Sequence, residues 1–308
     1  MKISLHNPGA SLFVADGTAQ EQALGRVTHL GIGAHADDLE MMAYHGIARC
    51  LHDDQRWFGG ITCTHGGGSA RSGPYADFSD DQMRRLRREE QENAARLGRY
   101  GALLQLDYAS ADICSGGGLN LRSDLLALLA AMRPRVVYTH NPADKHPSHL
   151  AVLVAAIEAM RRLPREQRPR TVYGCEVWRG LDWLPDQDKV ALDVSGHPEL
   201  SAALLGLFDS QISSGKRYDL AALGRQRANA TFHQPHQTDK AEKVALALDL
   251  TPLIQEDRMG IADYLEVFIE RFRQEVKENL GRAGEFHAKT RKKESGIRSQ
   301  ESGRRGGE

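Results

Sequence analysis

The sequence predicts an α/β protein built around a mostly parallel sheet. Short apolar runs typical of buried strands alternate with longer runs typical of helices, from residue 27 to about residue 194. Two neighbouring parallel strands need a crossover between them, and the intervening helices supply it. After residue 198 the chain reads as mainly helical, so we expect a helical C-terminal part beside the sheet.

The individual elements follow from local pattern. Strands are predicted at 27–34, 57–64, 101–108 and 135–140, and the segments 171–178 and 189–194 could extend the sheet. Helices are predicted at 38–51, 79–98, 121–132 and 147–160. Ser79 or Asp80 suits the N-cap of the second helix, and Pro147 suits the first turn of the last.

Three parts are expected along the chain. Residues 1–26 are mixed and turn-rich, and predict an arm laid over the domain. Residues 27–281 form the domain itself. Residues 282–308 are rich in Lys, Arg, Gly, Ser and Glu with almost no apolar content, which predicts a solvated, disordered tail. Contact of its basic residues with an acidic partner stays open as the alternative.

Composition narrows the class of protein. The 308 residues are 41% hydrophobic, enough for a sizeable core, and 40 basic against 41 acidic residues give no general attraction to nucleic acid or anionic membrane. No run of about 18 apolar residues predicts a membrane span, and the first residues do not resemble a secretory signal, so a cytoplasmic protein is expected. The four cysteines lie far apart, which argues against a disulfide framework or a zinc cluster.

Two polar clusters stand directly after predicted strands. The first is His-Ala-Asp-Asp-Leu-Glu at 35–40, and the second is His-Asn-Pro-Ala-Asp-Lys-His-Pro-Ser-His at 140–149. Sites in parallel α/β sheets form at the carboxyl ends of strands, and two strands of one sheet can bring separated clusters together. We therefore expect both clusters to contribute to one site.

The residue types in these clusters suit a zinc hydrolase, which needs three protein ligands, an open position for water and a base. His35 and Asp38 could bind one ion, and His149 could complete the ligand set. Asp37 could take a proton from the water. His146 could stabilise the oxyanion or protonate the leaving amine.

Plainer explanations exist for each residue taken alone. Adjacent aspartates after a strand often cap the following helix, and a single loop histidine is usually a polar surface residue. Both clusters, however, lie at predicted strand ends, and the sequence shows no competing nucleophile motif. This conjunction favours a metal site.

With these residues in view, the sequence resembles the LmbE-like, or PIG-L, family of zinc-dependent N-acetylglucosaminyl deacetylases. The family motif His-Pro-Asp-Asp-x-Glu stands here at 35–40, and the motif His-Pro-Asp-His with an upstream aspartate stands at 144–149. The loop CTHGGGSARSG at 63–73 and the Arg/Glu-rich helix at 87–98 occupy the corresponding places of the family. The likeness covers about residues 27–200.

The resemblance implies a Rossmann-like three-layer fold and a zinc ion held by His35, Asp38 and His149. It also implies Asp37 as the general base and His146 as the electrophilic or acid partner. The implied reaction removes the acetyl group of a small N-acetylated sugar, and His2Asp sites also accept iron or cobalt. Members of the family are often multimeric, so a homo-oligomer stays open.

Two positions depart from the family pattern. Ala36 replaces a proline, which affects loop stiffness. Ser148 replaces the aspartate that is thought to orient and charge the histidine two positions earlier. Serine cannot raise the pKa of His146 by Coulomb attraction. Asp144 could take that role from the other side; the alternative is a weaker acid and an altered pH profile.

Several further residues are candidates for substrate contact. Arg71 in the glycine-rich loop, Arg87 on the following helix and Asp144 could reach the substrate, although a solvated charge run explains Arg87 at least as well. Trp178 and Trp183 could form a sugar-stacking surface, but we expect ordinary packing. The pair His233 and His236 is expected in a surface loop or lid.

Two rival functions remain at this stage. One is another zinc amide or ester hydrolase on the same site, for example one acting on a thiol conjugate. The other is a non-catalytic sugar- or partner-binding protein that has kept the fold. A nicotinamide-dependent enzyme is disfavoured, because the first strand lacks the glycine-rich phosphate turn of dinucleotide folds.

Overall fold

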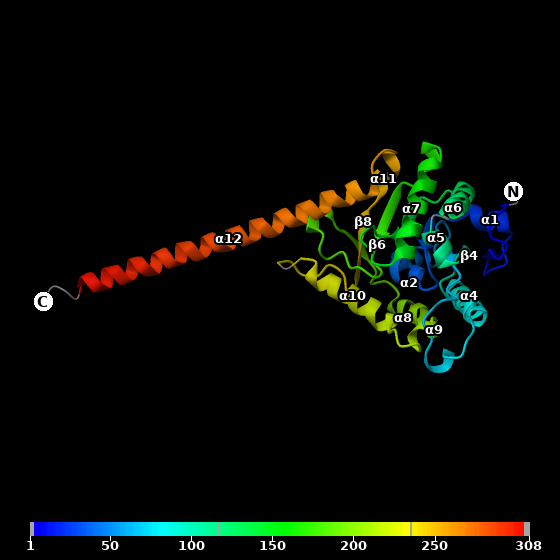
Figure 1. The fold of residues 1–308 in the computed structure, drawn as a ribbon, viewed down its shortest axis with the longest axis horizontal. Helices are drawn as coiled ribbons and strands as arrows, with labels where there is room; N and C mark the ends of the chain where they lie inside the picture. The colour runs from blue at the N-terminus through cyan, green and yellow to red at the C-terminus, as the bar shows by residue number, and fades with distance from the viewer. Residues whose placement is uncertain (1–2, 116–117, 235, 305–308) are drawn as a thin grey trace.

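The computed structural model describes residues 3–115, 118–234 and 236–304, and for residues 285–304 it describes the backbone alone. An eight-stranded sheet with the strand order β1-β4-β3-β2-β5-β6-β8-β7 runs through the body (Figure 1). Its strands are β1 (Ser11–Phe13), β2 (His29–Gly33), β3 (Phe58–Thr64), β4 (Ala102–Tyr108), β5 (Val136–His140), β6 (Thr171–Cys175), β7 (Val190–Asp193) and β8 (Val244–Asp249).

Helices connect and cover these strands. They are α1 (Gln20–Gly25), α2 (Asp38–Met42), α3 (Tyr44–Cys50), α4 (Asp80–Leu97), α5 (Ser110–Cys114), α6 (Gly118–Met132), α7 (Pro147–Arg162), α8 (Pro198–Gly206), α9 (Asp209–Ile212), α10 (Tyr218–Phe232), α11 (Thr251–Gln255) and α12 (Ile261–Arg304). Ser79 caps α4 through a capping box with Gln82, and Pro147 occupies the first turn of α7.

The predicted α/β class is confirmed, and the sheet is mixed. Strands β4, β3, β2, β5 and β6 pair in parallel, as the alternation of strands and helices predicts. The antiparallel strands lie toward the two edges: β1 pairs with β4, and β8 pairs with both β6 and β7. Neither β1 nor β8 was predicted. The predicted arm thus supplies an edge strand, and β8 interrupts the helical C-terminal part.

Two apolar clusters on opposite faces of the sheet make the protein three-layered. One face packs against α6, α7 and α11, and the other against α2, α3 and α8. Strand β4 shows the alternation: Leu104 and Leu106 belong to the first cluster, and Leu103 belongs to the second. Strands buried on both faces are continuous apolar runs in the sequence, and this pattern predicted the central strands.

The order of the strands reverses between β2 and β5. Strands β3 and β4 continue the sheet on one side of this pair, and β6 continues it on the other. Crossover helices then leave toward opposite faces, so a crevice opens outside the carboxyl ends of β2 and β5. Both polar clusters predicted from the sequence follow these two strands directly.

Gly33, the last residue of β2, allows α2 to begin close to the sheet. A Cβ atom at this position would lie 3.0 Å from the Cβ of Asp38 and 3.3 Å from a methyl of Leu39. Any larger residue would push the start of α2 away from the strand end. The glycine therefore helps to place Asp38 at the crevice.

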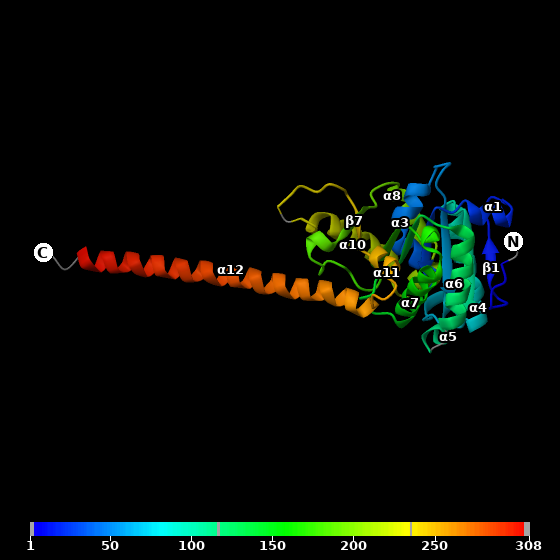
Figure 2. The same cartoon turned by 90° about the horizontal axis from the view of Figure 1, so that it is seen from above.

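Helix α12 extends far from the body in both views (Figures 1 and 2). It runs from Ile261 to Arg304 and includes residues 282–304, for which the sequence predicts a disordered tail; residues 305–308 lie outside the described residues. The division of the chain at residues 26 and 281 stays a prediction. Among the described residues, no helix combines the length and apolar character needed to cross a membrane.

His45, a half-buried histidine of α3, makes stability depend on pH. Burial, with Arg49 and His29 nearby, lowers the pKa of His45 to about 4 from 6.5. As the pH falls, the unfolded chain therefore takes up this proton first, and stability is lost between about pH 6.5 and 4. We predict that His45→Gln reduces the loss of unfolding free energy between pH 7 and 4.5 by about 1–2 kcal/mol.

Urea unfolding at several pH values measures this effect. His236→Gln is the matched control, because it removes a histidine whose side chain is exposed. Equal pH slopes for wild type and His45→Gln would contradict the assignment.

Candidate metal centre and its cavity

Three of the predicted ligands meet at the strand-order reversal. His35 Nδ1 lies 3.3 Å from Asp38 Oδ2 and 3.2 Å from His149 Nε2, and His149 Nε2 lies 3.4 Å from Asp38 Oδ1. His35 and Asp38 come from the turn between β2 and α2, and His149 comes from the first turn of α7. The expectation that one site draws on both clusters is thus met by the geometry.

These separations, in which Asp38 uses Oδ2 toward His35 and Oδ1 toward His149, are short enough for the three side chains to hold one ion. Ligand bonds of about 2.0–2.1 Å place the donor atoms roughly 3.3 Å apart in a tetrahedron. Two imidazoles and one carboxylate form the donor set of many catalytic zinc sites, with a fourth position left open. The side chains of His149 and Asp38 are 0% and 2% exposed, and His35 is 18% exposed, so the open position faces the side of His35.

His140 also lies beside Asp38 but is engaged differently. Its Nε2 is 3.5 Å from Asp38 Oδ2, and Asp38, His140 and His149 could by distance alone hold an ion. The backbone N–H of Ala34 donates to the same Nε2 at 3.0 Å, which occupies the lone pair that a metal would need. His140 therefore packs beside the ligand cluster without directing an N–H at Asp38, and its ring stacks on His149 at 3.8 Å. The sequence cluster contained His140, but its burial was not visible there.

Asp144 holds His149 from behind. Its Oδ1 lies 3.4 Å from His149 Nδ1, and it accepts hydrogen bonds from the backbone N–H groups of His146 and Trp178. Burial lowers the pKa of His149, but Asp38 and Asp144 outweigh burial and raise it. A proton on Nδ1 leaves the Nε2 lone pair directed at the metal position.

The two adjacent aspartates have opposite electrostatic surroundings. Burial opposes the ionisation of Asp38, yet His149, His140 and His35 together hold its pKa below the usual range. Burial raises the pKa of Asp37 well above its usual value, with Arg87 acting in the other direction. Carboxylates with divergent pKa values suit different roles, here a metal ligand and a base.

The backbone of Asp37 explains how its carboxylate reaches the cavity. Its φ of 96° lies in the left-handed region, which residues other than glycine rarely adopt. Although Asp37 stands at the N-cap of α2, its side chain makes no capping hydrogen bond. The backbone N–H instead donates to Gln91 at 3.2 Å, and Arg87 lies 3.5 Å from the carboxylate.

His146 stands at the N-cap of α7 beside the metal position. Its Nδ1 accepts a hydrogen bond from the backbone N–H of Ser148 at 3.3 Å, and its ring centroid lies 4.7 Å from that of His35. With Nδ1 acting as an acceptor, the neutral ring carries its proton on Nε2. Burial and the neighbouring His35 lower the pKa of His146, and Ser148 supplies no carboxylate to counter them.

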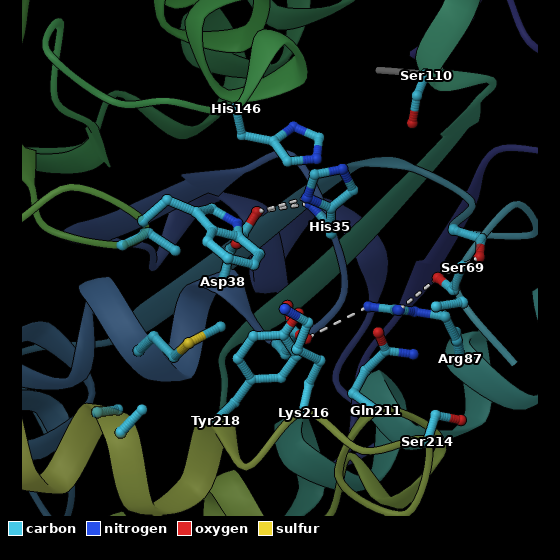
Figure 3. A pocket seen from close by; sticks show the side chains of 18 of the residues that line it. His35, Asp38, Ser69, Arg87, Ser110, His146, Gln211, Ser214, Lys216 and Tyr218 are labelled. Atoms are coloured by element: carbon cyan, nitrogen blue, oxygen red, sulfur yellow. Dashed lines mark hydrogen bonds and ion pairs between the residues drawn. The ribbon is translucent and has the colours of Figure 1, made fainter. Parts of the chain in front are cut away.

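These groups open into a cavity of about 860 Å³. Figure 3 shows His35, Asp38 and His146 gathered at one part of it, with Arg87 and Tyr218 on other parts of the wall. The cavity is large enough for a drug-sized ligand. The glycine-rich loop after β3 supplies part of the wall with residues 65–70, in agreement with its predicted position beside the site.

Of the three predicted substrate contacts, Arg87 lines the cavity and the other two do not. Arg87 donates to Ser69 Oγ at 2.6 Å and to the carbonyl of Ala36. It therefore also connects the glycine-rich loop to the turn between β2 and α2. Arg71 turns to Gly67 and Asp80, which closes the loop on itself. Asp144 is buried behind His149. Substrate roles for these three residues stay predictions.

The C-terminal part supplies a wall that sequence reasoning largely missed. Trp178, expected to pack in the core, lines the cavity, whereas Trp183 packs on the core and against Phe272. Tyr218 of α10 stands edge-on to Trp178 at 5.9 Å, and Lys216 lies 5.4 Å above the same ring. No local pattern marks these positions. The segment His233–His236, considered as a lid, does not line the cavity, and residue 235 lies outside the described residues.

This fold and centre define an α/β protein with a candidate His/Asp metal site at a strand-order reversal. Residues 30–160 match the family model described as "PIG-L: GlcNAc-PI de-N-acetylase". The resemblance seen in the sequence is therefore confirmed over this segment, which contains every predicted ligand as well as Asp37 and His146. No curated protein matches the chain.

Solved structures share the fold at low sequence identity. The conserved protein TT1542 from Thermus thermophilus is 18% identical with a TM-score of 0.56, covering 73% of this chain and 96% of that one. GalB, the 4-carboxy-2-hydroxymuconate hydratase from Pseudomonas putida, is 18% identical with a TM-score of 0.54, covering 73% and 97%. N,N'-diacetylchitobiose deacetylase from Pyrococcus horikoshii is 18% identical with a TM-score of 0.51, covering 75% and 88%.

These neighbours include a hydratase beside a deacetylase, so the shared fold does not by itself define the reaction. The reaction of this chain has to be argued from its own residues.

The ligand assignment predicts a difference between two neighbouring histidines. His149→Ala removes a ligand and should abolish stoichiometric zinc binding, measured by elemental analysis after dialysis. His140→Gln keeps an acceptor for the Ala34 N–H and should retain the zinc. If both variants lost zinc equally, His140 would have to be counted as a ligand.

Asp144→Asn should weaken zinc binding by about 10- to 100-fold, because it removes the charge that orients His149. Competition with a chelating dye measures the affinity. Asp182→Asn, an exposed position, is the control. An unchanged affinity would show that Asp144 does not act through His149.

Proposed function

We propose that this protein is a zinc-dependent hydrolase that removes an N-acetyl group from an amino sugar or a glucosaminide-type small molecule. The observation that carries the proposal is the convergence of His35, Asp38 and His149, whose nearest nitrogen and oxygen atoms lie 3.2–3.4 Å apart. A base lies directly beside it, in a cavity of about 860 Å³. A divalent ion held there supplies Lewis acidity, which activates water and polarises an amide carbonyl.

The side chains around the ion divide the remaining work. Asp37 takes the proton of the attacking water, and burial raises its pKa, which makes its carboxylate a stronger base than an exposed one. Arg87 keeps that carboxylate in place from 3.5 Å. His146 donates the N–H of Nε2 to the oxyanion as the tetrahedral centre forms. The amide C–N bond then breaks as Asp37 passes the proton that it took from water to the leaving nitrogen, and acetate and the free amine leave.

An amino sugar suits the cavity wall beside the metal ligands. Trp178 lines this wall next to His146, and sugar rings stack on aromatic side chains through their C–H groups. Gln211, Ser214 and Ser69 add hydrogen-bonding groups along the same cavity. Tyr218, half-buried and electrostatically coupled to Asp37 and Asp38, is placed to donate to a group of the substrate near the metal.

The two rivals differ from the proposal in what they predict. An amidase for a thiol conjugate would use the same centre but release a different acid. A sugar-binding protein would bind zinc and ligand without turnover; the replacement of an aspartate by Ser148 favours it, and the retained Asp37 argues against it.

Acetate release from N-acetylglucosamine and simple N-acetylglucosaminides tests the proposal. We expect release by the zinc-loaded protein, none after metal removal, and recovery when zinc is restored. Asp37→Asn should lower kcat by about 10²- to 10⁴-fold, because it removes the base and keeps the shape.

Asp77→Asn, at an exposed position, is the control for Asp37→Asn, and both variants should hold as much zinc as wild type. Turnover that persists in Asp37→Asn would sink the assignment of the base. Zinc binding without acetate release from any of these substrates would favour the two alternative functions, an amidase for a thiol conjugate or a sugar-binding protein.

A further inference from the structure

Helix α12 carries an apolar stripe that is exposed to solvent. Its members recur at intervals of three and four residues, which places them on one face of the helix. They are exposed to 47%, 39%, 41% and 69% for Ile269, Phe272, Val276 and Leu280. Such a row of apolar side chains is typical of a surface that meets a partner.

The helix leaves the body at this stripe. Phe268 is buried, Arg271 donates to Asp188 at 2.5 Å, and Phe272 lies 6.3 Å from Trp183. Over the described side chains 273–284, the hydrogen bonds and ion pairs join residues of α12 to one another, not to the body. Figure 2 shows α12 continuing outward beyond this point.

A helix of 44 residues is far longer than the roughly 11–12 residues usual in globular proteins. Most helical stability in proteins comes from packing of an apolar face, and the outer part of α12 has no such packing within the described chain. A membrane span does not explain it either, since no described helix is long and apolar enough. Long periodic helices of this kind are typical of coiled coils.

We propose that α12 pairs with α12 of a second copy of this chain, with the two helices running in opposite directions. Glu275 and Arg282 flank the stripe, and neither pairs with an opposite charge among the described residues. If Val276 of one helix lies beside Asn279 of the other, Glu275 of each copy falls beside Arg282 of the second copy. Two-fold symmetry makes this contact twice, and flanking charge pairs of this kind set the direction of coiled-coil helices.

The antiparallel arrangement also separates the two bodies. Because α12 projects away from its own body, opposite helix directions place the bodies at opposite ends of the pair. The pairing buries the apolar stripe of each copy against the other. It depends on α12 alone and is independent of the proposed reaction.

Light scattering of the full chain after size exclusion tests the pairing. We expect a mass about twice the 34.1 kDa of one chain for wild type at micromolar concentration. Val276→Asp puts a charge into the stripe and should return the mass to that of one chain. Gln274→Asp adds the same charge on the opposite side of the helix and should leave the pair intact.

A charge exchange tests the direction of the helices. Glu275→Arg alone places like charges together and should raise the dissociation constant by at least about tenfold. The double variant Glu275→Arg/Arg282→Glu restores both charge pairs and should return the constant to near the wild-type value. Near-UV circular dichroism of each variant, measured at a concentration too low for pairing, verifies that the body is intact.

A wild-type chain that stays monomeric, or a pair that survives Val276→Asp, would overturn the proposal. Failure of the double variant to restore pairing would overturn the antiparallel direction. Binding of a monomeric chain to anionic vesicles, lost in Val276→Asp, would assign the stripe to a membrane surface instead.

Discussion

The site depends on the meeting of two parallel strand ends where the strand order reverses. His35 and His149 are 114 positions apart, yet their ring nitrogens lie 3.2 Å from each other because β2 and β5 are neighbours in the sheet. Gly33 lets α2 start against the strand, which sets the position of Asp38. Any shift of β2 relative to β5 would separate the ligands, so the core on both faces of the sheet also determines the geometry of the centre.

Burial gives the polar residues at this point their different characters. Asp38 faces three histidines and stays ionised, whereas Asp37, next to it in sequence, faces chiefly Arg87 and has a raised pKa. The left-handed backbone at Asp37 turns the two carboxylates toward different surroundings. Adjacent residues can therefore serve as the proposed ligand and the proposed base, and Asp144 contacts His149 from its buried side.

The replacement of the family aspartate by Ser148 leaves the His146 ring with a hydrogen bond that orients it. The backbone N–H of residue 148 donates to His146 Nδ1, and this contact does not depend on which side chain stands at 148. The ring is thereby oriented without an added negative charge, and its proton sits on the nitrogen that faces the cavity. His146 can donate a hydrogen bond because its neutral ring carries a proton on Nε2. A raised pKa is not needed for this.

The sequence by itself determined the central strands, the helices between them and the identity of the residues at the centre. Strands buried on both faces are continuous apolar runs, and the two polar clusters directly follow such runs. Strands β1 and β8 were not predicted from the sequence. Strand β1 is an edge strand of only three residues, and β8 follows a helical stretch, so neither has a clear local pattern. Only the tertiary structure could decide that His140 Nε2 accepts from Ala34 while His149 Nε2 faces His35 and Asp38. Only it could decide that Trp178, Lys216 and Tyr218 line the cavity. These outcomes depend on which segments meet in space, whereas local pattern reports only on neighbours along the chain.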